Sequence, residues 1–172
     1  PAPAEGGVGS FAQRCYTLAM TRLLPILMLL LLAAPATAAD AAPSWRCPPT
    51  PPDDQGPFYR PGAPVRSRLG EGYLLSGTVK SAADCRPLAG AKIELWLTGP
   101  DGRYDDRWRA TLFSGRSGRY SFQSHFPGPY GSRPPHIHII VSAPGFRELV
   151  TQQYPQPGTA SGTFDLVLMP TP

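Results

Sequence analysis

Short runs of apolar side chains, separated by turn-forming residues, recur from residue 73 to the end of the chain. Apolar and polar positions alternate within these runs: Ile93, Leu95 and Leu97 fall on one side of a run. Tyr120 and Phe122 share one side of another run. A period of two is typical of a strand that buries one face. The pattern therefore predicts seven strands, over residues 73–80, 91–98, 107–113, 119–124, 136–142, 148–153 and 163–169.

The links between these strands are short and rich in turn residues, such as PDG at 100–102 and GRSG at 115–118. Strands of this length and spacing predict an all-β fold, an antiparallel sandwich of about seven to eight strands over residues 73–172. Eight prolines between residues 40 and 72 exclude a regular helix or a central strand there. We expect residues 40–72 to form an extended, Pro-rich arm laid over the sandwich.

The first 39 residues have the pattern of a segment that is removed from the mature protein. Residue 1 is Pro and the first methionine is Met20, which is followed by Arg22, an apolar run over 23–34 and a small-residue exit at 36–38. These are the three parts of a signal peptide, and the run is shorter than the roughly 20 residues of a membrane span. We predict upstream translation over 1–19, a signal peptide over 20–39, export to the periplasm or the exterior, and no stable membrane insertion after cleavage. A buried or amphipathic N-terminal helix is the alternative.

Composition narrows the classes of partner. Lys and Arg number 16 against 12 Asp and Glu, but charged residues make up only 16% of the chain and no basic run occurs, so we expect no nucleic-acid partner. Two cysteines, Cys47 and Cys85, follow the signal peptide. In an exported protein they can form one disulfide that joins the arm to the first strands, and two free thiols are the alternative.

Candidate chemistry centres on two histidines. His136 and His138 stand two positions apart in a predicted strand, so both imidazoles project from one side while Ile137 and Ile139 point to the core. Such a pair can bind Fe, Cu, Zn or Ni, although two solvent-facing histidines on an edge strand explain the spacing as well. Two tyrosines add to this pattern. Tyr130 precedes the pair in a loop stiffened by Pro and Gly, and Tyr104 follows a turn.

Four motifs between residues 56 and 154 resemble the intradiol ring-cleavage dioxygenases, of the protocatechuate 3,4-dioxygenase and catechol 1,2-dioxygenase kind. The resemblance covers about residues 55–169. It is carried by GPFY at 56–59, LWLTGPDGRYDD at 95–106, SGRYSFQSHFPGPYGSRPPHIHIIVSAPGF at 117–146 and TQQY at 151–154. Compared with the larger members of this family, we expect the chain to be a short form without the helical N-terminal part of the catechol dioxygenases.

The resemblance implies a cofactor, a non-haem Fe(III) ion, bound by Tyr104, Tyr130, His136 and His138. A phenol has a pKa near 10, but a trivalent cation favours its deprotonated form. In the family, the residue at Tyr130 leaves the metal and acts as a base, and the one at Arg133 stabilises negative charge on the ring. Gln152 matches a polar position beside the site. The implied partners are a small aromatic diol and O2, and the implied product is a cis,cis-muconate-type dicarboxylate.

Two other functions compete with this one. The hairpin sequence GTVKSAADCRPLAGAKIELW is similar to transthyretin-like and carboxypeptidase-regulatory modules, which bind without catalysis, but it gives no reason for the tyrosines and histidines. The second competing function is that of a degenerate enzyme, which binds iron but no longer turns over substrate. The identity of the catechol and the formation of a homo-oligomer are open. Two side chains also have open roles: Trp96 as a pocket wall or a core residue, and Phe58 as a cover of the site or a packing residue. Tyr154 is expected to be structural.

Overall fold

The structure is a computed structural model that describes residues 44–172. The predicted upstream segment and signal peptide lie outside the described residues. Within that part of the chain, no helix has the length and apolar character needed to cross a bilayer. The strands are β1 (Tyr73–Ser81), β2 (Lys92–Thr98), β3 (Tyr104–Phe113), β4 (Arg119–Ser124), β5 (Ile137–Ser142), β6 (Leu149–Gln153), β7 (Ser161–Thr163) and β8 (Leu166–Leu168).

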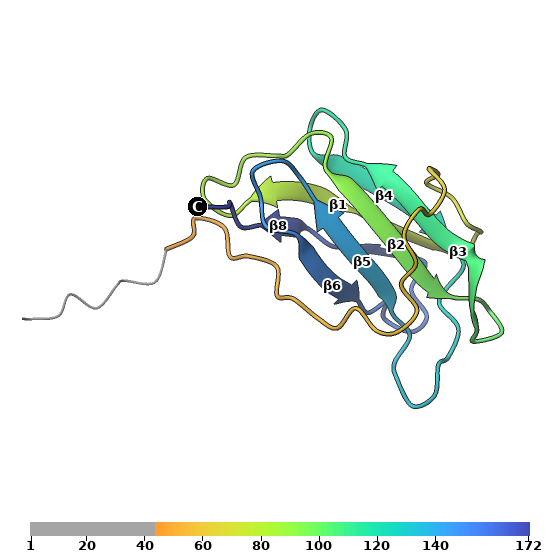
Figure 1. Cartoon of the computed structure of the whole chain (residues 1–172). Helices are drawn as coiled ribbons and strands as arrows, with labels where there is room; N and C mark the ends of the chain where they lie inside the picture. Colours follow the sequence, from red (N-terminus) through yellow and green to blue (C-terminus); the bar gives the residue numbers. More distant parts are fainter. Residues whose placement is uncertain (1–43) are drawn as a thin grey trace, which may run out of the picture. The chain divides into compact units, whose positions relative to one another are not determined.

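These strands form two sheets that pack face to face, so the prediction of an all-β sandwich is confirmed (Figure 1). One sheet has the order β3-β2-β5-β6 and is antiparallel throughout. In the other, β4 pairs antiparallel with β1, whereas β7 and β8 both pair with β1 in parallel. This sheet therefore adds two short parallel pairings to a sandwich that is otherwise antiparallel.

The predicted strand over 163–169 is two strands, and the break lies at Phe164 and Asp165. The Asp165 carboxylate accepts hydrogen bonds from the backbone N–H of Thr78, at 2.8 Å, and from Lys80 Nζ, at 2.5 Å. The Phe164 carbonyl lies so close to Gly77 that a Cβ there would be 2.0 Å from its oxygen. The chain thus bends around β1, and β7 and β8 pair with different parts of it.

The core lies between the sheets and follows the predicted alternation. Ile93, Leu95 and Leu97 of β2 are buried there, together with Tyr120 and Phe122 of β4. Fully burying a large apolar side chain stabilises a fold by about 1.5–3 kcal/mol. The other face of β2 and β5, which carries the candidate chemistry, lies outside this core and under the arm.

The arm is extended, as expected, and pairs with three strand edges. Its backbone N–H groups at Asp53, Arg66 and Leu69 donate to carbonyls of β6, β3 and β4 in turn. Figure 1 shows this segment, in orange to yellow, passing below β6 and across the β5 and β2 ends. Because exposed strand edges invite pairing with other chains, the arm protects this sandwich. A homo-oligomer stays a prediction.

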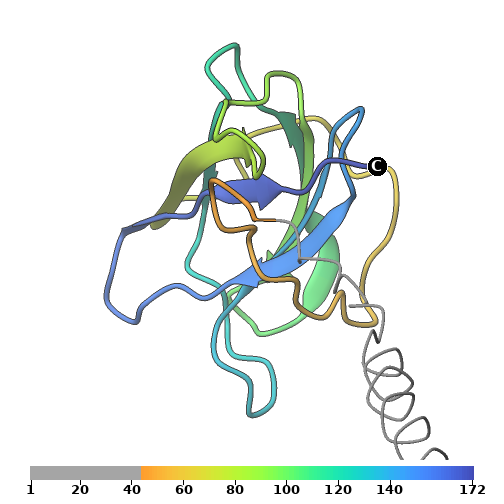
Figure 2. The ribbon, with the colours of Figure 1, turned by 90° about the vertical axis from the view of Figure 1, so that its left-hand side faces the viewer.

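A disulfide anchors the start of the arm. Cys47 bonds to Cys85, with their Cα atoms 5.4 Å apart, so the alternative of two free thiols does not hold in this structure. The backbone N–H of Thr50 donates to Val167 of β8 at 3.1 Å. Figure 2 shows this first part of the arm, in orange, beside β8.

Candidate metal centre

The outer face of the β3-β2-β5-β6 sheet carries the candidate site. His138 lies in β5 and His136 immediately before it, while Ile137 and Ile139 point to the core as predicted. Trp96 of β2 is opposite His138 in the register, and their rings stack at 4.7 Å with an interplanar angle of 2°. Trp96 is therefore part of the site's surroundings and not a residue of the sandwich core.

Three donor atoms converge on this face. The Tyr104 Oη lies 3.0 Å from His136 Nε2 and 3.0 Å from His138 Nε2, and the two Nε2 atoms are 3.1 Å apart. Ligands about 2.0–2.1 Å from one metal ion and at right angles to each other are about 3 Å apart. The three separations therefore fit neighbouring ligands of a single ion, and the phenol and imidazole donors fit a transition metal.

The chemical state of the histidines also fits a metal site. His136 Nδ1 lies 2.8 Å from the carbonyl oxygen of Pro134, which can only accept, so Nδ1 carries the proton and Nε2 has a free lone pair. A backbone carbonyl on the far nitrogen is a common partner of metal-binding imidazoles. Burial lowers the pKa of His136, and burial with the neighbouring His136 and Arg133 lowers the pKa of His138 to about 4. Both rings are thus neutral near pH 7.

Tyr104 is held protonated by its surroundings. Burial, with a smaller contribution from Tyr130, raises the pKa of Tyr104 to about 12, while the positive charge of Arg133 opposes the shift. A bound trivalent cation would reverse this preference, because it stabilises the phenolate directly. Carboxylates and thiols do not supply a competing site: within residues 44–172, no three His, Cys, Asp or Glu side chains cluster around one point.

Tyr130 lies beside this group but not within it. Its ring packs edge-on against Tyr104 at 5.3 Å and against Phe58 at 5.4 Å, and the side chain is 37% exposed. The structure thus brings three of the four predicted ligands to hydrogen-bonding distance and leaves the fourth in ring contact. The assignment of these residues as metal ligands stays a prediction.

Close backbone packing positions the two tyrosines. The turn before Tyr104 and the loop that carries Tyr130 touch at glycines: a Cβ on Gly128 would lie 2.1 Å from the Gly99 carbonyl oxygen. A Cβ on Gly102, whose φ is 73°, would lie 2.2 Å from the Pro129 carbonyl oxygen. Only glycine permits this approach, so both turns meet as one unit.

The arm covers the site from above. Phe58 stacks on Tyr104, with ring centroids 4.3 Å apart and an interplanar angle of 15°, which fits the role of a cover. Tyr59 packs on Trp96 at 5.2 Å. Gly56 lies over His138, and its φ of 68° makes it a left-handed residue. A cleft of about 310 Å³ opens beside this cover, and Phe58, Trp96 and Tyr104 form part of its wall.

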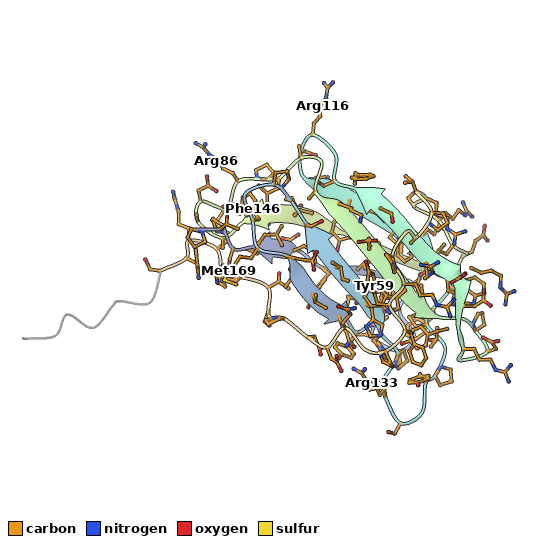
Figure 3. All side chains as sticks on the ribbon, viewed as in Figure 1. Tyr59, Arg86, Arg116, Arg133, Phe146 and Met169 are labelled. Carbon is orange, nitrogen blue, oxygen red and sulfur yellow. A yellow bond between two sulfur atoms is a disulfide. The ribbon has the colours of Figure 1, made fainter. Side chains whose placement is uncertain are left out.

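A polar network forms the opposite border of the site. Arg133 Nη2 donates to Gln152 Oε1 at 2.8 Å, and Gln152 Nε2 donates to the Asp54 carbonyl oxygen at 2.5 Å. Tyr154, expected to be structural, joins this network together with Asp53 of the arm. In Figure 3, Arg133 lies at the end of the molecule formed by the loop before β5, and Tyr59 lies over the sheet face.

Sequence reasoning missed three contributors to the site: Asp53, Gly56 and Tyr154. Tyr154 had a usable signal, because it stands two residues after Gln152 and so on the same side of an extended chain. Asp53 and Gly56 had none, because their contacts join distant segments: 101 positions separate Asp53 from Tyr154, and Gly56 lies against His138 of β5.

Comparisons with known proteins agree on one family. A sequence model described as "Dioxygenase" matches residues 55–159. Catechol 1,2-dioxygenase 2 of Acinetobacter lwoffii is 35% identical over 138 residues, which cover 60% of this chain and 50% of that protein. For 6-chlorohydroxyquinol 1,2-dioxygenase of Cupriavidus pinatubonensis the identity is 32%, and the match covers 58% of this chain and 48% of that protein. The chain thus spans about half the length of the curated relatives that it matches.

Solved structures give the same result. The dioxygenase domain of a dioxygenase and carbohydrate-binding protein fusion from Streptomyces sp. SirexAA-E has a TM-score of 0.66 and 30% identity. The match covers 72% of this chain and 100% of that domain. Chlorocatechol 1,2-dioxygenase of Pseudomonas putida has a TM-score of 0.62 at 26% identity, and the match covers 69% of this chain and 71% of that protein.

Proposed function

Because the chain belongs to the dioxygenase family whose sequence model matches residues 55–159, we propose that it cleaves a catechol-type diol with O2 between the two hydroxylated carbons. Both oxygen atoms enter the product, a cis,cis-muconate-type dicarboxylate, so the substrate and O2 account for every atom of it. The observation that carries the proposal is the meeting of Tyr104, His136 and His138 at 3.0–3.1 Å beside Tyr130. The family match favours this function over a non-catalytic sandwich module.

We assign a non-haem Fe(III) ion to Tyr104, Tyr130, His136 and His138. When bound, ferric iron supplies an electron-accepting centre that binds the diol and makes its ring reactive toward O2. Two phenolate oxygens favour the ferric over the ferrous state, and the neutral imidazoles offer lone pairs without proton release. The donor set differs from the two-His, one-carboxylate face of ferrous oxygenases.

The remaining residues bind and orient the substrate. Tyr130 is partly exposed and next to Tyr104, so its phenolate oxygen can accept a proton from an incoming diol hydroxyl. Arg133 places a permanent cation at the border of the site, where it stabilises negative charge that develops on the ring. Gln152 holds that guanidinium through its amide oxygen. Phe58, stacked over Tyr104, excludes water from one side of the site.

The direct test is iron loading followed by optical titration. Stoichiometric iron should give a visible absorption band from phenolate-to-iron charge transfer, and anaerobic addition of catechol should shift it. O2 should then be consumed one molecule per ring. Tyr104→Phe should lose colour and activity, whereas Tyr120→Phe, which removes a hydroxyl bonded to the Phe164 carbonyl oxygen away from the site, should keep both. A colourless protein with stoichiometric iron contradicts the proposal, as does a visible absorption band that no catechol shifts.

We also propose that the protein is exported. The apolar run over 23–34 with its small-residue exit supports this, as does the Cys47–Cys85 disulfide, because such bonds persist in oxidising compartments. Cell fractionation of the expressed full chain tests it. The mature N-terminus, read by mass spectrometry, should fall near Asp40, and a cytoplasmic protein that keeps residues 20–39 would refute export.

A further inference from the structure

Tyr154 connects the arm to the charged border of the candidate site. Its Oη lies 2.8 Å from Asp53 Oδ2, 3.3 Å from Arg133 Nη2 and 3.1 Å from Gln152 Oε1. Its ring centroid is 6.0 Å from that of His136. Tyr154 therefore contacts the network that holds Arg133, yet its hydroxyl is not among the three converging donor atoms.

The direction of each hydrogen bond follows from the groups involved. A guanidinium only donates and a carboxylate only accepts, so the Tyr154 hydroxyl accepts from Arg133 and gives its single proton to Asp53. The Gln152 amide is oriented as well, because its Nε2 donates to a carbonyl oxygen of the arm and its oxygen faces Arg133. Two acceptors thus fix the same guanidinium nitrogen, and both are themselves held by the arm.

We propose that Tyr154, with Asp53, is a positioning residue that holds the Arg133 guanidinium in place before substrate binds. An arginine side chain carries about 2 kcal/mol of rotamer entropy, which a fixed guanidinium does not lose again on binding. The arm carboxylate reaches Arg133 through the hydroxyl and restrains it without neutralising it by direct contact. The inference rests on the proposed function, in which Arg133 stabilises negative charge on the bound diol.

The kinetic test compares Tyr154→Phe, which keeps the ring and removes the hydroxyl, in two backgrounds. In the wild-type background it should lower kcat/KM for catechol about tenfold, in the range seen for supporting residues of metal sites, while iron content and the visible band stay unchanged. In an Arg133→Gln background it should cause no further loss. Tyr120→Phe is the matched control, because its hydroxyl donates to the Phe164 carbonyl oxygen at 2.6 Å and not to the Arg133 network, and it should leave kcat/KM unchanged in either background.

An equal loss in both backgrounds, or no loss in either, overturns the proposal. A metal-free measurement separates its failure from that of the proposed function. In urea, Tyr154→Phe and Arg133→Gln should each lower the unfolding midpoint, and the double variant should shift it by clearly less than the sum. Additive shifts overturn the contact itself. Non-additive midpoint shifts, combined with an iron-loaded protein whose visible band does not change on addition of catechol, overturn the positioning role together with the proposed function.

Discussion

Burial sets the protonation of three candidate ligands. Tyr104, His136 and His138 are all partly or fully removed from water, which disfavours every charged form. The imidazoles are therefore neutral and the phenol is protonated in the metal-free protein. A cation bound among them would exchange the phenol proton for a metal bond, whereas the imidazoles have no proton to lose. Burial thus favours the neutral form of both imidazoles, which is the form that metal binding would require.

One consequence is a pH dependence of stability in the metal-free protein. The pKa of His138 is about 4 in the folded state, against about 6.5 when unfolded, so the unfolded chain binds the proton first. The stability that this residue contributes is present above pH 6.5 and is lost as the pH falls toward 4. The slope is at most about 1.4 kcal/mol per pH unit for one proton.

Urea unfolding at pH 7.0, 5.5 and 4.5 measures this slope. His138→Gln, which cannot take up a proton, should flatten it over the same range. A variant with the wild-type slope would show that other groups carry the pH dependence.

Gly56 tests how closely the arm fits the site. Gly56→Ala forces a side chain into a left-handed backbone, with a cost of roughly 1–2 kcal/mol. Its Cβ would also lie 3.2 Å from His138 Cε1 and displace the ring. Gly62→Ala is the matched control, because its φ of 76° brings the same strain with no atom within 4 Å. Both should lose stability, but only Gly56→Ala should weaken Co²⁺ binding in an optical titration, and equal affinities would exclude contact with the site.

At the scale of elements, the two turns that carry tyrosines act as one unit. The loop before β5 and the turn between β2 and β3 share backbone contacts, and Thr98 Oγ1 donates to the Gly128 carbonyl oxygen at 2.7 Å. The distance between Tyr104 and Tyr130 therefore depends on backbone packing and not on direct side-chain bonds.

Gly128→Ala should separate these turns. Its Cβ would meet a backbone oxygen at 2.1 Å, which cannot move aside easily, so we expect a loss of about 2–3 kcal/mol in the free energy of unfolding. Gly131→Ala in the same loop meets no atom within 4 Å and carries only the strain of a φ of 56°. Urea unfolding compares the two, and a Gly128→Ala protein no less stable than Gly131→Ala would disprove the shared packing.

At the scale of the whole molecule, the arm links the strand edges to the site. It is joined covalently at Cys47, pairs with β6, β3 and β4, and covers Tyr104 on the way. The same segment therefore protects the sandwich edges and completes the site. Stability of the fold and accessibility of the site are coupled through it.

Removal of the disulfide should destabilise the fold without detaching the arm. The bond closes a loop of 38 residues, for which chain entropy predicts up to about 4 kcal/mol. Cys47→Ala/Cys85→Ala should lower the free energy of unfolding in urea by about 2–4 kcal/mol. Reduction should lower the wild-type urea midpoint but leave that of the double variant unchanged. Equal midpoints for oxidised and reduced wild type would show that the backbone hydrogen bonds alone hold the arm.

Local pattern predicted the elements well. The alternation in Ile93, Leu95 and Leu97 gave the strand and its buried face, and prolines gave the extended arm. The last predicted strand failed because its break depends on Asp165 and Phe164 meeting β1, a contact between segments 87 residues apart. The sequence did not predict the parallel pairing of β7 and β8 with β1 for the same reason, because a strand's own sequence does not record the direction of its partner.

The sequence by itself determined which side chains face the same way: His136 with His138, and Gln152 with Tyr154, because strand geometry repeats every two residues. Only the tertiary structure decided which distant groups meet. It brought the Tyr104 hydroxyl to the two imidazoles, Gly56 over His138, and Asp53 to Tyr154. Periodicity encodes local backbone and burial, whereas such meetings depend on sheet register and on the path of the arm, which the packing of the whole chain sets.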